Sequence, residues 1–202
     1  MKIIAVGRNY VEHIEELKND FPTSPVIFTK PDSAILLNND PFFYPPFSSS
    51  IHHEVEVVIK IKKAGKNIQE KFAHKYYDEI GLGIDFTARD IQSELKQKGL
   101  PWDLAKGFNG SAPLSKFVSK EKYKLGDLNF NLEVNGENRQ TGNTAKMIYS
   151  FNYIISFVSQ YFTLKIGDLI FTGTPAGVAE VKIGDNLKGY LEKDLMFDFN
   201  VK

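Results

Sequence analysis

The chain has 202 residues, the size of one ordinary domain and enough to enclose a substantial core. Its 25 Lys and Arg residues balance 25 Asp and Glu residues, so the net charge gives no reason to expect a nucleic-acid partner or a membrane surface. The chain has no cysteine, which excludes disulfides, thiolate metal sites and a cysteine nucleophile. Arg8 interrupts the apolar N-terminus too early for a secretory signal, and no apolar run approaches the roughly 18 residues of a membrane helix. We therefore expect a cytoplasmic protein made of a single domain over residues 1–202.

The pattern of apolar residues and turn residues predicts many short strands and a few short helices. In chain order the predicted elements are a strand at 2–6, a helix at 10–18, a strand at Val26–Thr29, a strand along the β-branched run Val55–Ile61, a helix at Gln69–Tyr77, a strand at 80–87, a helix at 88–98, a strand at 128–134, a helix at Met147–Phe162, and strands at Leu169–Thr172 and 187–201. Asn9 and Glu12 are expected to cap the first helix, and Asn135-Gly136 predicts a hairpin turn. Since strands and helices do not alternate regularly, we expect a β-rich α+β domain.

The candidate metal site rests on Glu54 and Glu56, which are two residues apart on a predicted strand and therefore point to the same face. Two like charges held that close repel one another, and water or a cation must relieve the repulsion. An exposed strand with polar residues at alternate positions would show the same spacing, so the pair alone does not decide between the two interpretations. Asp85 lies in an apolar, glycine-rich segment and supplies a third carboxylate, although it could instead stabilise a turn. Three carboxylates without cysteine favour Mg²⁺ or Mn²⁺ over Zn²⁺.

His13 and Glu16 share one face of the first predicted helix, because they are three residues apart. They could form a dyad in which the carboxylate orients the imidazole to take a proton from water, or they could belong to a solvated side of the helix. His52 and His53 point to opposite faces of their strand, so one could support the metal carboxylates while the other packs. The residues alone leave these alternatives open.

Lys106 lies in a mainly apolar segment, where a lysine either extends to the surface or, if partly buried, stabilises an enolate or a carboxylate. The turn Thr172–Gly177 carries amides and hydroxyls that suit a small carboxylate, although such a turn commonly binds no ligand. Gly81-Leu82-Gly83 lacks the third glycine of a dinucleotide fingerprint, and the sequence has no P-loop. The sequence therefore gives no indication of a nucleotide cofactor.

Taken together, these motifs resemble those of the fumarylacetoacetate hydrolase family, and most closely its acylpyruvate hydrolase and oxaloacetate decarboxylase branch. The matching segments follow the family order over essentially the whole chain, at Gly7–Tyr10 with His13, His52–Glu56, Asp85–Gln92, Lys98–Trp102 with Lys106, Asn135-Gly136 with Gln140, and Gly167–Val178. The resemblance implies a mixed β-sandwich roll with a few short helices, assembled as a homodimer.

The resemblance also implies roles for residues of the site. The implied ligands of Mg²⁺ or Mn²⁺ are Glu54, Glu56 and Asp85. The implied catalytic residues are His13 and Glu16, on a short helix that orders over bound substrate, and Lys106. The implied substrate-binding residues are Arg89, Gln92 and Thr174.

The implied function is metal-dependent hydrolysis of a carbon–carbon bond in acylpyruvates, which gives pyruvate and a carboxylic acid. Water deprotonated by His13 would attack the C4 carbonyl, and the metal with Lys106 would hold the charge of the pyruvate enolate. Oxaloacetate decarboxylation and keto–enol isomerisation pass through the same enolate, so both are alternatives. A third alternative is a protein that binds small 2-oxo acids without catalysis, against which the intact His13–Glu16 pair argues. The expected partners are a small 2-oxo acid and a second copy of the chain, with neither nucleic acid nor membrane.

Overall fold

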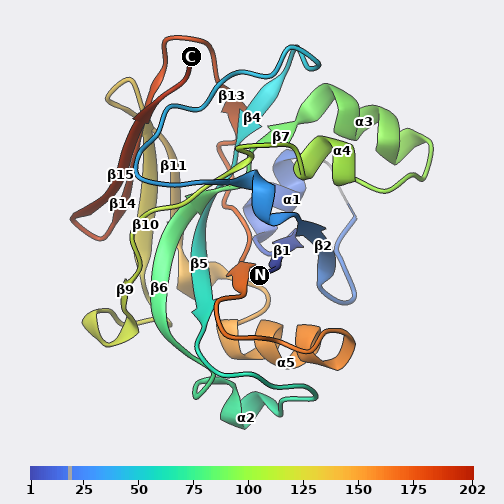
Figure 1. Cartoon of the computed structure of the whole chain (residues 1–202), viewed down its shortest axis with the longest axis vertical. Helices are drawn as coiled ribbons and strands as arrows, with labels where there is room; N and C mark the ends of the chain where they lie inside the picture. Colours follow the sequence, from blue (N-terminus) through green and yellow to red (C-terminus); the bar gives the residue numbers. More distant parts are fainter. Residues whose placement is uncertain (18–19) are drawn as a thin grey trace.

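The computed structural model describes residues 1–17 and 20–202, and β-branched residues build its centre. Val55, Val57, Val58, Ile59 and Ile61 are all buried, which places their strand in the interior of a six-stranded sheet. The strands of that sheet, in spatial order, are β2 (Val26–Lys30), β1 (Ile3–Gly7), β12 (Leu169–Phe171), β5 (Val55–Ile61), β6 (Tyr77–Ile84) and β9 (Val118–Ser119) (Figure 1). β1 and β12 are parallel, whereas the other neighbouring pairs are antiparallel.

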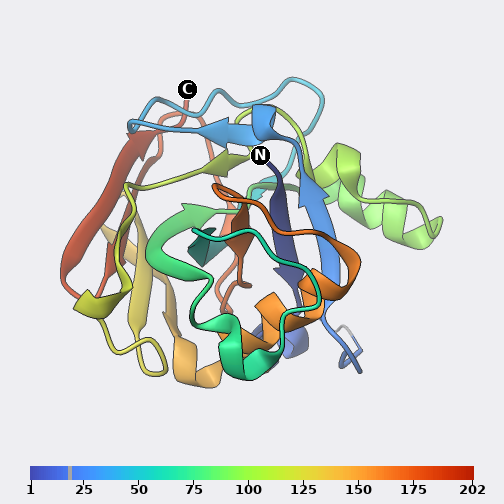
Figure 2. The same ribbon diagram turned by 60° about the horizontal axis from the view of Figure 1, so that its bottom comes forward.

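A second, four-stranded antiparallel sheet packs against the first and encloses the core. Its strands, in spatial order, are β11 (Glu137–Asn143), β10 (Asn129–Val134), β14 (Asn186–Leu191) and β15 (Asp194–Asn200). Asn135 and Gly136 have left-handed φ angles of 55° and 79°, as the predicted hairpin turn between β10 and β11 requires. Alternate residues of β10 and β14 point inward and join residues of β5 and β6 in one hydrophobic cluster. The expected mixed, β-rich α+β roll is confirmed (Figures 1 and 2).

Smaller elements surround the two main sheets. The small sheets join β13 (Ala179–Glu180) to β4 (Ile51–His53) and β7 (Thr87–Ala88), and β3 (Ile35–Leu36) to β8 (Ala112–Pro113). The helices are α1 (Val11–Glu16), α2 (Glu70–Ala73), α3 (Arg89–Gln97), α4 (Asp103–Lys106) and α5 (Phe151–Tyr161), with 3₁₀ turns at Asp32–Ala34, Lys120–Lys122 and Thr144–Lys146. α3 and α4 pack together beside β7, whereas α2 and α5 pack together at the opposite end of the molecule (Figure 1). Within the described residues, no helix is long and apolar enough to cross a bilayer.

Several predicted elements differ from the structure in their extent; for example, α5 begins at Phe151, four residues after its predicted start at Met147. The helix predicted at Gln69–Tyr77 is confined to α2, because Tyr77 is the first residue of β6 and packs edge-on against Phe151 with ring centroids 6.5 Å apart. The strand predicted at 80–87 is interrupted by Asp85-Phe86, which separates β6 from β7. The interruption matters for the site, because it leaves Asp85 at the end of a buried strand.

The predicted capping of the first helix is wrong. Tyr10 occupies the position before α1 and makes no side-chain cap bond. The Asn9 amide is used in tertiary contacts instead, since its Oδ1 accepts from Tyr149 N at 2.7 Å and its Nδ2 donates to Thr172 O at 2.7 Å. These bonds tie the end of β1 to the segment that follows β12. Lys18, in the helix predicted at 10–18, lies outside the described residues.

Candidate active site

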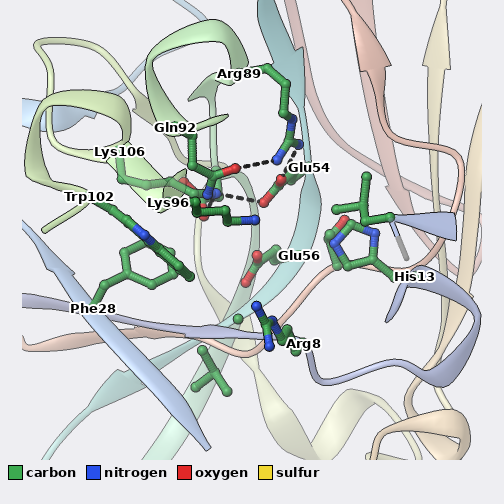
Figure 3. Close-up of a pocket in the computed structure, with 15 residues that line it drawn as sticks. Arg8, His13, Phe28, Glu54, Glu56, Arg89, Gln92, Lys96, Trp102 and Lys106 are labelled. Atoms are coloured by element: carbon green, nitrogen blue, oxygen red, sulfur yellow. Dashed lines mark hydrogen bonds and ion pairs between the residues drawn. The ribbon is translucent and has the colours of Figure 1, made fainter. Parts of the chain in front are cut away.

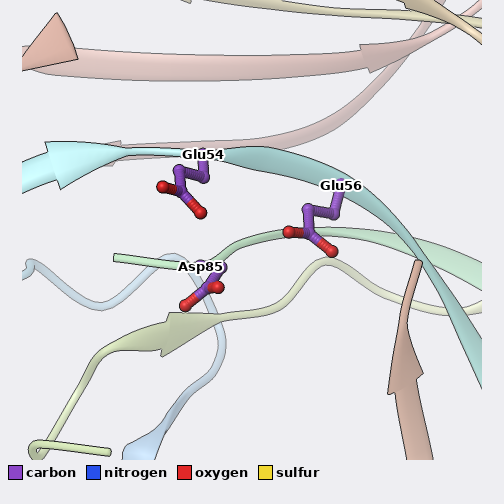
Figure 4. Close-up of side chains that lie close together, drawn as sticks. All are labelled: Glu54, Glu56 and Asp85. Carbon is purple, nitrogen blue, oxygen red and sulfur yellow. The ribbon is translucent and has the colours of Figure 1, made fainter. Parts of the chain in front are cut away.

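Glu54, Glu56 and Asp85 converge where the start of β5 pairs with the end of β6, at one end of these strands of the six-stranded sheet (Figure 4). Glu54 lies between β4 and β5, Glu56 is on β5, and Asp85 follows β6. The Asp85 amide donates to the Glu54 carbonyl oxygen at 2.8 Å, which fixes the two chain segments side by side. Each residue offers a carboxylate oxygen, and these oxygens lie within 4.8 Å of one another. The residues are 5 %, 2 % and 1 % exposed, so the alternative of an exposed polar strand is excluded.

Lys106 lies directly beside the carboxylates, at the end of α4. Its Nζ donates to Glu54 Oε2 at 2.8 Å, to Asp85 Oδ2 at 2.7 Å and to Thr87 Oγ1 at 2.5 Å. Burial by itself would lower the pKa of Lys106, but the two carboxylates outweigh it and the pKa is raised, so the ammonium stays charged. Because these bonds use all three ammonium hydrogens, Lys106 acts through its charge unless a substrate oxygen replaces one of the acceptors.

The first turn of α3 covers the other side of Glu54. The Arg89 guanidinium approaches Glu54, with Nη2 2.5 Å from Oε1, and its Nη1 donates to Gln92 Oε1 at 2.7 Å. Gln92 is three residues further along the helix and is buried, so both side chains lie on the face of α3 that lines the cavity (Figure 3). The structure therefore brings these two predicted substrate-binding residues to the carboxylates.

Lys30, at the end of β2, is a residue that the sequence analysis did not select. Its side chain is fully buried, and its Nζ lies 2.6 Å from Asp85 Oδ1. The same Nζ donates to Ser111 O at 2.9 Å and to Ser111 Oγ at 3.0 Å. The Asp85 carboxylate therefore forms ion pairs with two ammonium groups, those of Lys30 and Lys106, and these pairs fix its orientation. A lysine before Pro31 at the end of an apolar strand is too weak a sequence signal to predict this contact.

Glu54 and Glu56 have opposite electrostatic environments. Burial alone would raise the pKa of Glu54, but Lys106 and Arg89 outweigh it and hold the pKa well below its usual range. The pKa of Glu56 is raised well above its usual range, first by burial and then by the charges of Asp85 and Glu54. The Oε2 atom of Glu56 accepts a hydrogen bond from the Gly173 amide at 2.6 Å. Gly173 has φ +103°, and a Cβ there would lie 2.6 Å from Asn9 Cβ, so the close approach requires glycine.

This donor set fits a hard divalent cation. All the donors are carboxylate oxygens, and they are buried, convergent and fixed by the surrounding cations. The repulsion that raises the pKa of Glu56 is what a bound cation would relieve. Mg²⁺ and Mn²⁺ prefer such oxygen ligands. The three predicted ligands would therefore hold the ion.

His13 lies on α1 across the cavity from Glu54 and Glu56 (Figure 3), and Glu16 is on the same helix. His13 Nδ1 is 3.4 Å from Glu16 Oε2, and Glu16 Oε1 accepts a hydrogen bond from the Gly177 amide at 3.0 Å. Burial lowers the pKa of His13, so the imidazole is neutral near pH 7. The Gly177 contact also links α1 to the segment after β12. His13 and Glu16 therefore lie in contact, and the neutral imidazole of His13 lines the same cavity as the carboxylates.

The predicted support of the metal carboxylates by one of the tandem histidines is not seen among the described residues. His53 Nδ1 pairs with Gln140 Oε1 at 2.8 Å, and Gln140 Nε2 donates to Thr174 Oγ1 at 2.9 Å. His53 thus positions Thr174, the third predicted substrate-binding residue, which lines the cavity. His52 Nε2 pairs with Ser50 Oγ at 3.1 Å. Within the described part of the chain, neither histidine bonds to the three carboxylates.

The cavity itself is small, with about 30 Å³ in which the centre of a water molecule could move. The rings of Phe28 and Trp102, with centroids 5.9 Å apart, form one wall, and the Phe28 ring centroid lies 5.1 Å from Lys106 Nζ. Lys96 and Arg8 complete the lining (Figure 3). No sequence pattern indicated any of these four residues for the site. Lys96 could have been found, because it lies four residues after Gln92 on the same helix face.

Comparison with known proteins places this geometry in a family. Residues 2–195 match the family model described as the fumarylacetoacetate (FAA) hydrolase C-terminal domain. The mouse protein named oxaloacetate tautomerase FAHD1, mitochondrial, is 44% identical over 201 residues, which are 99% of this chain and 91% of the mouse protein. The Dictyostelium discoideum protein named oxaloacetate decarboxylase, mitochondrial, is 44% identical over 202 residues, covering 98% of this chain and 93% of that protein.

A solved structure supports the same assignment. Fumarylpyruvate hydrolase from Pseudomonas aeruginosa, crystallised with Mn²⁺ and pyruvate, superposes with a TM-score of 0.94 at 31% identity and covers 100% of this chain and 89% of that one. Both the sequence match and the fold therefore extend over nearly the whole chain. The chain belongs to the fumarylacetoacetate hydrolase family and is an enzyme.

Proposed function

We propose that this protein is a divalent-metal-dependent tautomerase that interconverts the keto and enol forms of oxaloacetate. The observation that carries the proposal is the neutral imidazole of His13, which faces three buried carboxylates across a small cavity. A keto–enol interconversion needs a base, a site for developing negative charge and nothing else. The names of the mouse and Dictyostelium relatives support oxaloacetate as the substrate.

The residues of the chain account for the proton transfer. With Nδ1 of His13 directed to Glu16, its Nε2 presents the lone pair that accepts a proton from C3 of the keto form. The electron pair of that C–H bond becomes the C2–C3 double bond, and the 2-oxo oxygen gains the negative charge. The imidazolium then returns the proton to this oxygen, which yields the enol. Glu54, Glu56 and Asp85 would hold a metal ion, which when bound would supply a Lewis acid for the charge of the enolate.

The remaining residues of the site support this transfer. Lys106 adds a positive charge beside Glu54 and Asp85 that favours the enolate, and its ammonium stays charged in the buried site. Glu16 stabilises the imidazolium while His13 holds the proton, and its bond to the Gly177 amide keeps it in place. The walls of Phe28 and Trp102 limit the entry of water, which would compete for the proton.

The test follows both tautomers and products. Enol oxaloacetate is added to the protein with Mg²⁺, and the loss of enol absorbance is compared with pyruvate formation in a coupled assay. A tautomerase accelerates the loss of enol absorbance without forming pyruvate, and a chelator abolishes the acceleration. Pyruvate formed at the rate of enol loss would show a decarboxylase, and no acceleration at any metal concentration would refute the proposal.

Acylpyruvate hydrolysis is the second candidate. It is favoured by the intact His13–Glu16 pair, which could take a proton from water as well as from C3, and by the similarity to fumarylpyruvate hydrolase. Acetylpyruvate assayed under the same conditions separates the two functions, because only hydrolysis yields pyruvate and acetate.

Three further expectations remain proposals. We infer a homodimer, which light scattering of the purified protein would test. We also expect the cytoplasm as the compartment, although the two relatives named above are mitochondrial. Localisation of a tagged full chain would test this. Finally, we expect Mg²⁺ rather than Mn²⁺ to be the working ion, which competition between the two ions would test.

A further inference from the structure

The cavity contains more positive charge than the three carboxylates require. Arg89 and Lys106 are both paired with Glu54. Lys96 also lines the cavity, but within residues 1–17 and 20–202 no carboxylate lies within ion-pairing distance of its Nζ. That Nζ lies over the Trp102 ring instead, 5.2 Å from its centroid. A cation that is directed into a cavity and held over an aromatic face is well placed to receive an anion.

The fold holds Lys96 in this position. Arg89, Gln92 and Lys96 follow one another at helical spacing along the face of α3 that lines the cavity. The side chain is half-buried among other cations, and the pKa of Lys96 is lowered to about 8 by burial and by the charges of Arg89 and Arg8. A bound carboxylate would relieve this repulsion.

Arg8 lies on the opposite side of the cavity from Lys96 (Figure 3). Its backbone φ is +59°, a left-handed conformation that is disfavoured for a residue with a Cβ. Residues held in such conformations are concentrated at functional sites. Nη1 donates to the Asp20 carbonyl oxygen at 3.2 Å, which orients the guanidinium. The strained backbone thus turns an arginine into the cavity directly after the central strand β1.

We propose that Arg8 and Lys96 form a subsite for the carboxylate at C4 of a dicarboxylic 2-oxo acid. This inference rests on the proposed function, because it places the 2-oxo acid end of the substrate at the three carboxylate ligands. Oxaloacetate carries two negative charges, whereas pyruvate and acylpyruvates with a neutral chain carry one. The subsite would therefore select dianions by charge, and a guanidinium suits a carboxylate because it can donate two parallel hydrogen bonds.

The first experiment replaces Lys96 and compares two ligands that share the 2-oxo acid end. In Lys96→Met, KM for oxaloacetate should rise by about tenfold or more with little change in kcat, because a charge-assisted contact is lost. The inhibition constant of pyruvate should change less than about twofold, because pyruvate has no distal carboxylate. Lys96→Arg should restore KM. The matched control is Lys98→Met, which removes the same charge from an exposed lysine at the end of the same helix.

A binding measurement keeps the subsite testable apart from turnover. Trp102 is the single tryptophan of the chain and lies beside Lys96, so its fluorescence reports on this position. Oxaloacetate at its keto–enol equilibrium should quench or shift the emission of the wild type at lower concentration than it does for Lys96→Met and Arg8→Gln. Arg8→Lys, which keeps the charge, should lie between the wild type and Arg8→Gln.

The outcomes separate the two proposals. Equal loss of affinity for oxaloacetate and pyruvate in Lys96→Met would refute the subsite, and so would an unchanged KM for oxaloacetate. If the wild type turns over no oxaloacetate with Mg²⁺ or Mn²⁺, the proposed function fails, and the fluorescence titration still decides whether the dianion is preferred.

Discussion

The inner wall and the outer rim of the cavity differ in how their charges are balanced. The inner wall consists of the carboxylates Glu54, Glu56 and Asp85 with the cations Lys30, Lys106 and Arg89. The outer rim consists of His13, Arg8 and Lys96. On the inner wall, Glu54 and Asp85 are paired with the three cations, and these groups are held by strands of the six-stranded sheet and by α3 and α4. On the rim, Lys96 lies over the Trp102 ring and, among the described residues, has no carboxylate within ion-pairing distance of its Nζ.

The difference indicates a division of labour within one small cavity. A paired, buried set of charges is rigid, because moving one charged group leaves its partner buried without a counter-charge, which costs free energy. Such a set is suited to fixing the ligands of a metal ion before the ion arrives. Lys96 on the rim has no such carboxylate partner among the described residues, so its charge is available to a substrate. The inner wall would thus define the chemistry, and the rim would define which 2-oxo acid is accepted.

The largest expected effect comes from breaking the charge balance of the inner wall. Glu56→Gln keeps the shape of the side chain but leaves two carboxylates against three cations, so the site would repel a divalent ion. We expect Mg²⁺ affinity to fall by more than about 100-fold, since loss of a direct ligand should exceed the 10–100-fold cost of losing an outer contact. Turnover would be lost with it. Calorimetric titration with Mg²⁺ measures the change, and Glu79→Gln on the exposed side of β6 is the control. If Glu56→Gln bound Mg²⁺ with wild-type affinity, Glu56 would not be a ligand of the metal ion.

The next largest effect is expected from replacing His13, the proposed general base of the rim. His13→Ala should lower kcat by about 10²- to 10⁴-fold, the usual contribution of a positioned general base. Mg²⁺ affinity should stay within about twofold of the wild type, because His13 belongs to the rim and not to the ligand set. The two measurements together distinguish a base from a metal ligand. Turnover that survives in His13→Ala would contradict the proton-transfer role. A parallel loss of Mg²⁺ binding would show that His13 takes part in binding the metal ion.

Lys30 tests whether the inner wall is held by buried pairing. Lys30→Met leaves Asp85 with one cation partner, and we expect Mg²⁺ affinity to fall by about 10–100-fold. The free energy of unfolding should fall by about 3–5 kcal/mol, the cost of removing one partner from a buried pair. The matched control is Lys60→Met on β5, whose pair with Glu79 is exposed and should be worth at most about 1 kcal/mol. Urea denaturation and Mg²⁺ titration provide the measurements, and equal stability of the two variants would contradict the structural role of Lys30.

A site residue could be predicted from sequence when its partners are close to it along the chain, and not when they are distant. Glu54 and Glu56 are two residues apart where β5 begins, so their common direction follows from local geometry, and Asp85 stands out against an apolar segment. The spacing of His13 and Glu16 is equally local. Lys30 could not be found in this way, because its role is set by a contact with a distant strand that only the assembled sheet creates.

The fold shows the same limit. The hairpin at Asn135-Gly136 and the β-branched strand β5 were predictable, because turn residues and side-chain patterns determine them directly. The capping role of Asn9 was wrong because tertiary hydrogen bonds to Tyr149 and Thr172 replaced the local one. The predicted end of the helix at Tyr77 was wrong because Tyr77 pairs as the first residue of β6. Local signals failed where contacts distant in sequence competed for the same side chain.

The smallest expected effect is on the pH dependence of kcat/KM, which tests whether the charge of Lys96 on the rim is used. The groups that face Lys96 are Arg89 on its own helix, Arg8 after β1, Lys106 on α4 and Glu54 beside β5, and only Glu54 favours the charged form. Since the pKa of Lys96 is about 8 in the free protein, the ammonium is charged below pH 8 and is lost above it. kcat/KM reports ionisations of the free enzyme, so kcat/KM for oxaloacetate should fall by about tenfold per pH unit once the pH exceeds this value.

Lys96→Arg separates this ionisation from others in the cavity. A guanidinium keeps its charge at any pH below about 12, so the decline of kcat/KM between pH 8 and pH 9 should disappear in this variant. Inhibition by pyruvate should show no matching decline, because the monoanion does not use the rim. If Lys96→Arg and the wild type lose activity together as the pH rises, the ionising group lies elsewhere. The rim would then contribute shape to the cavity rather than selection by charge.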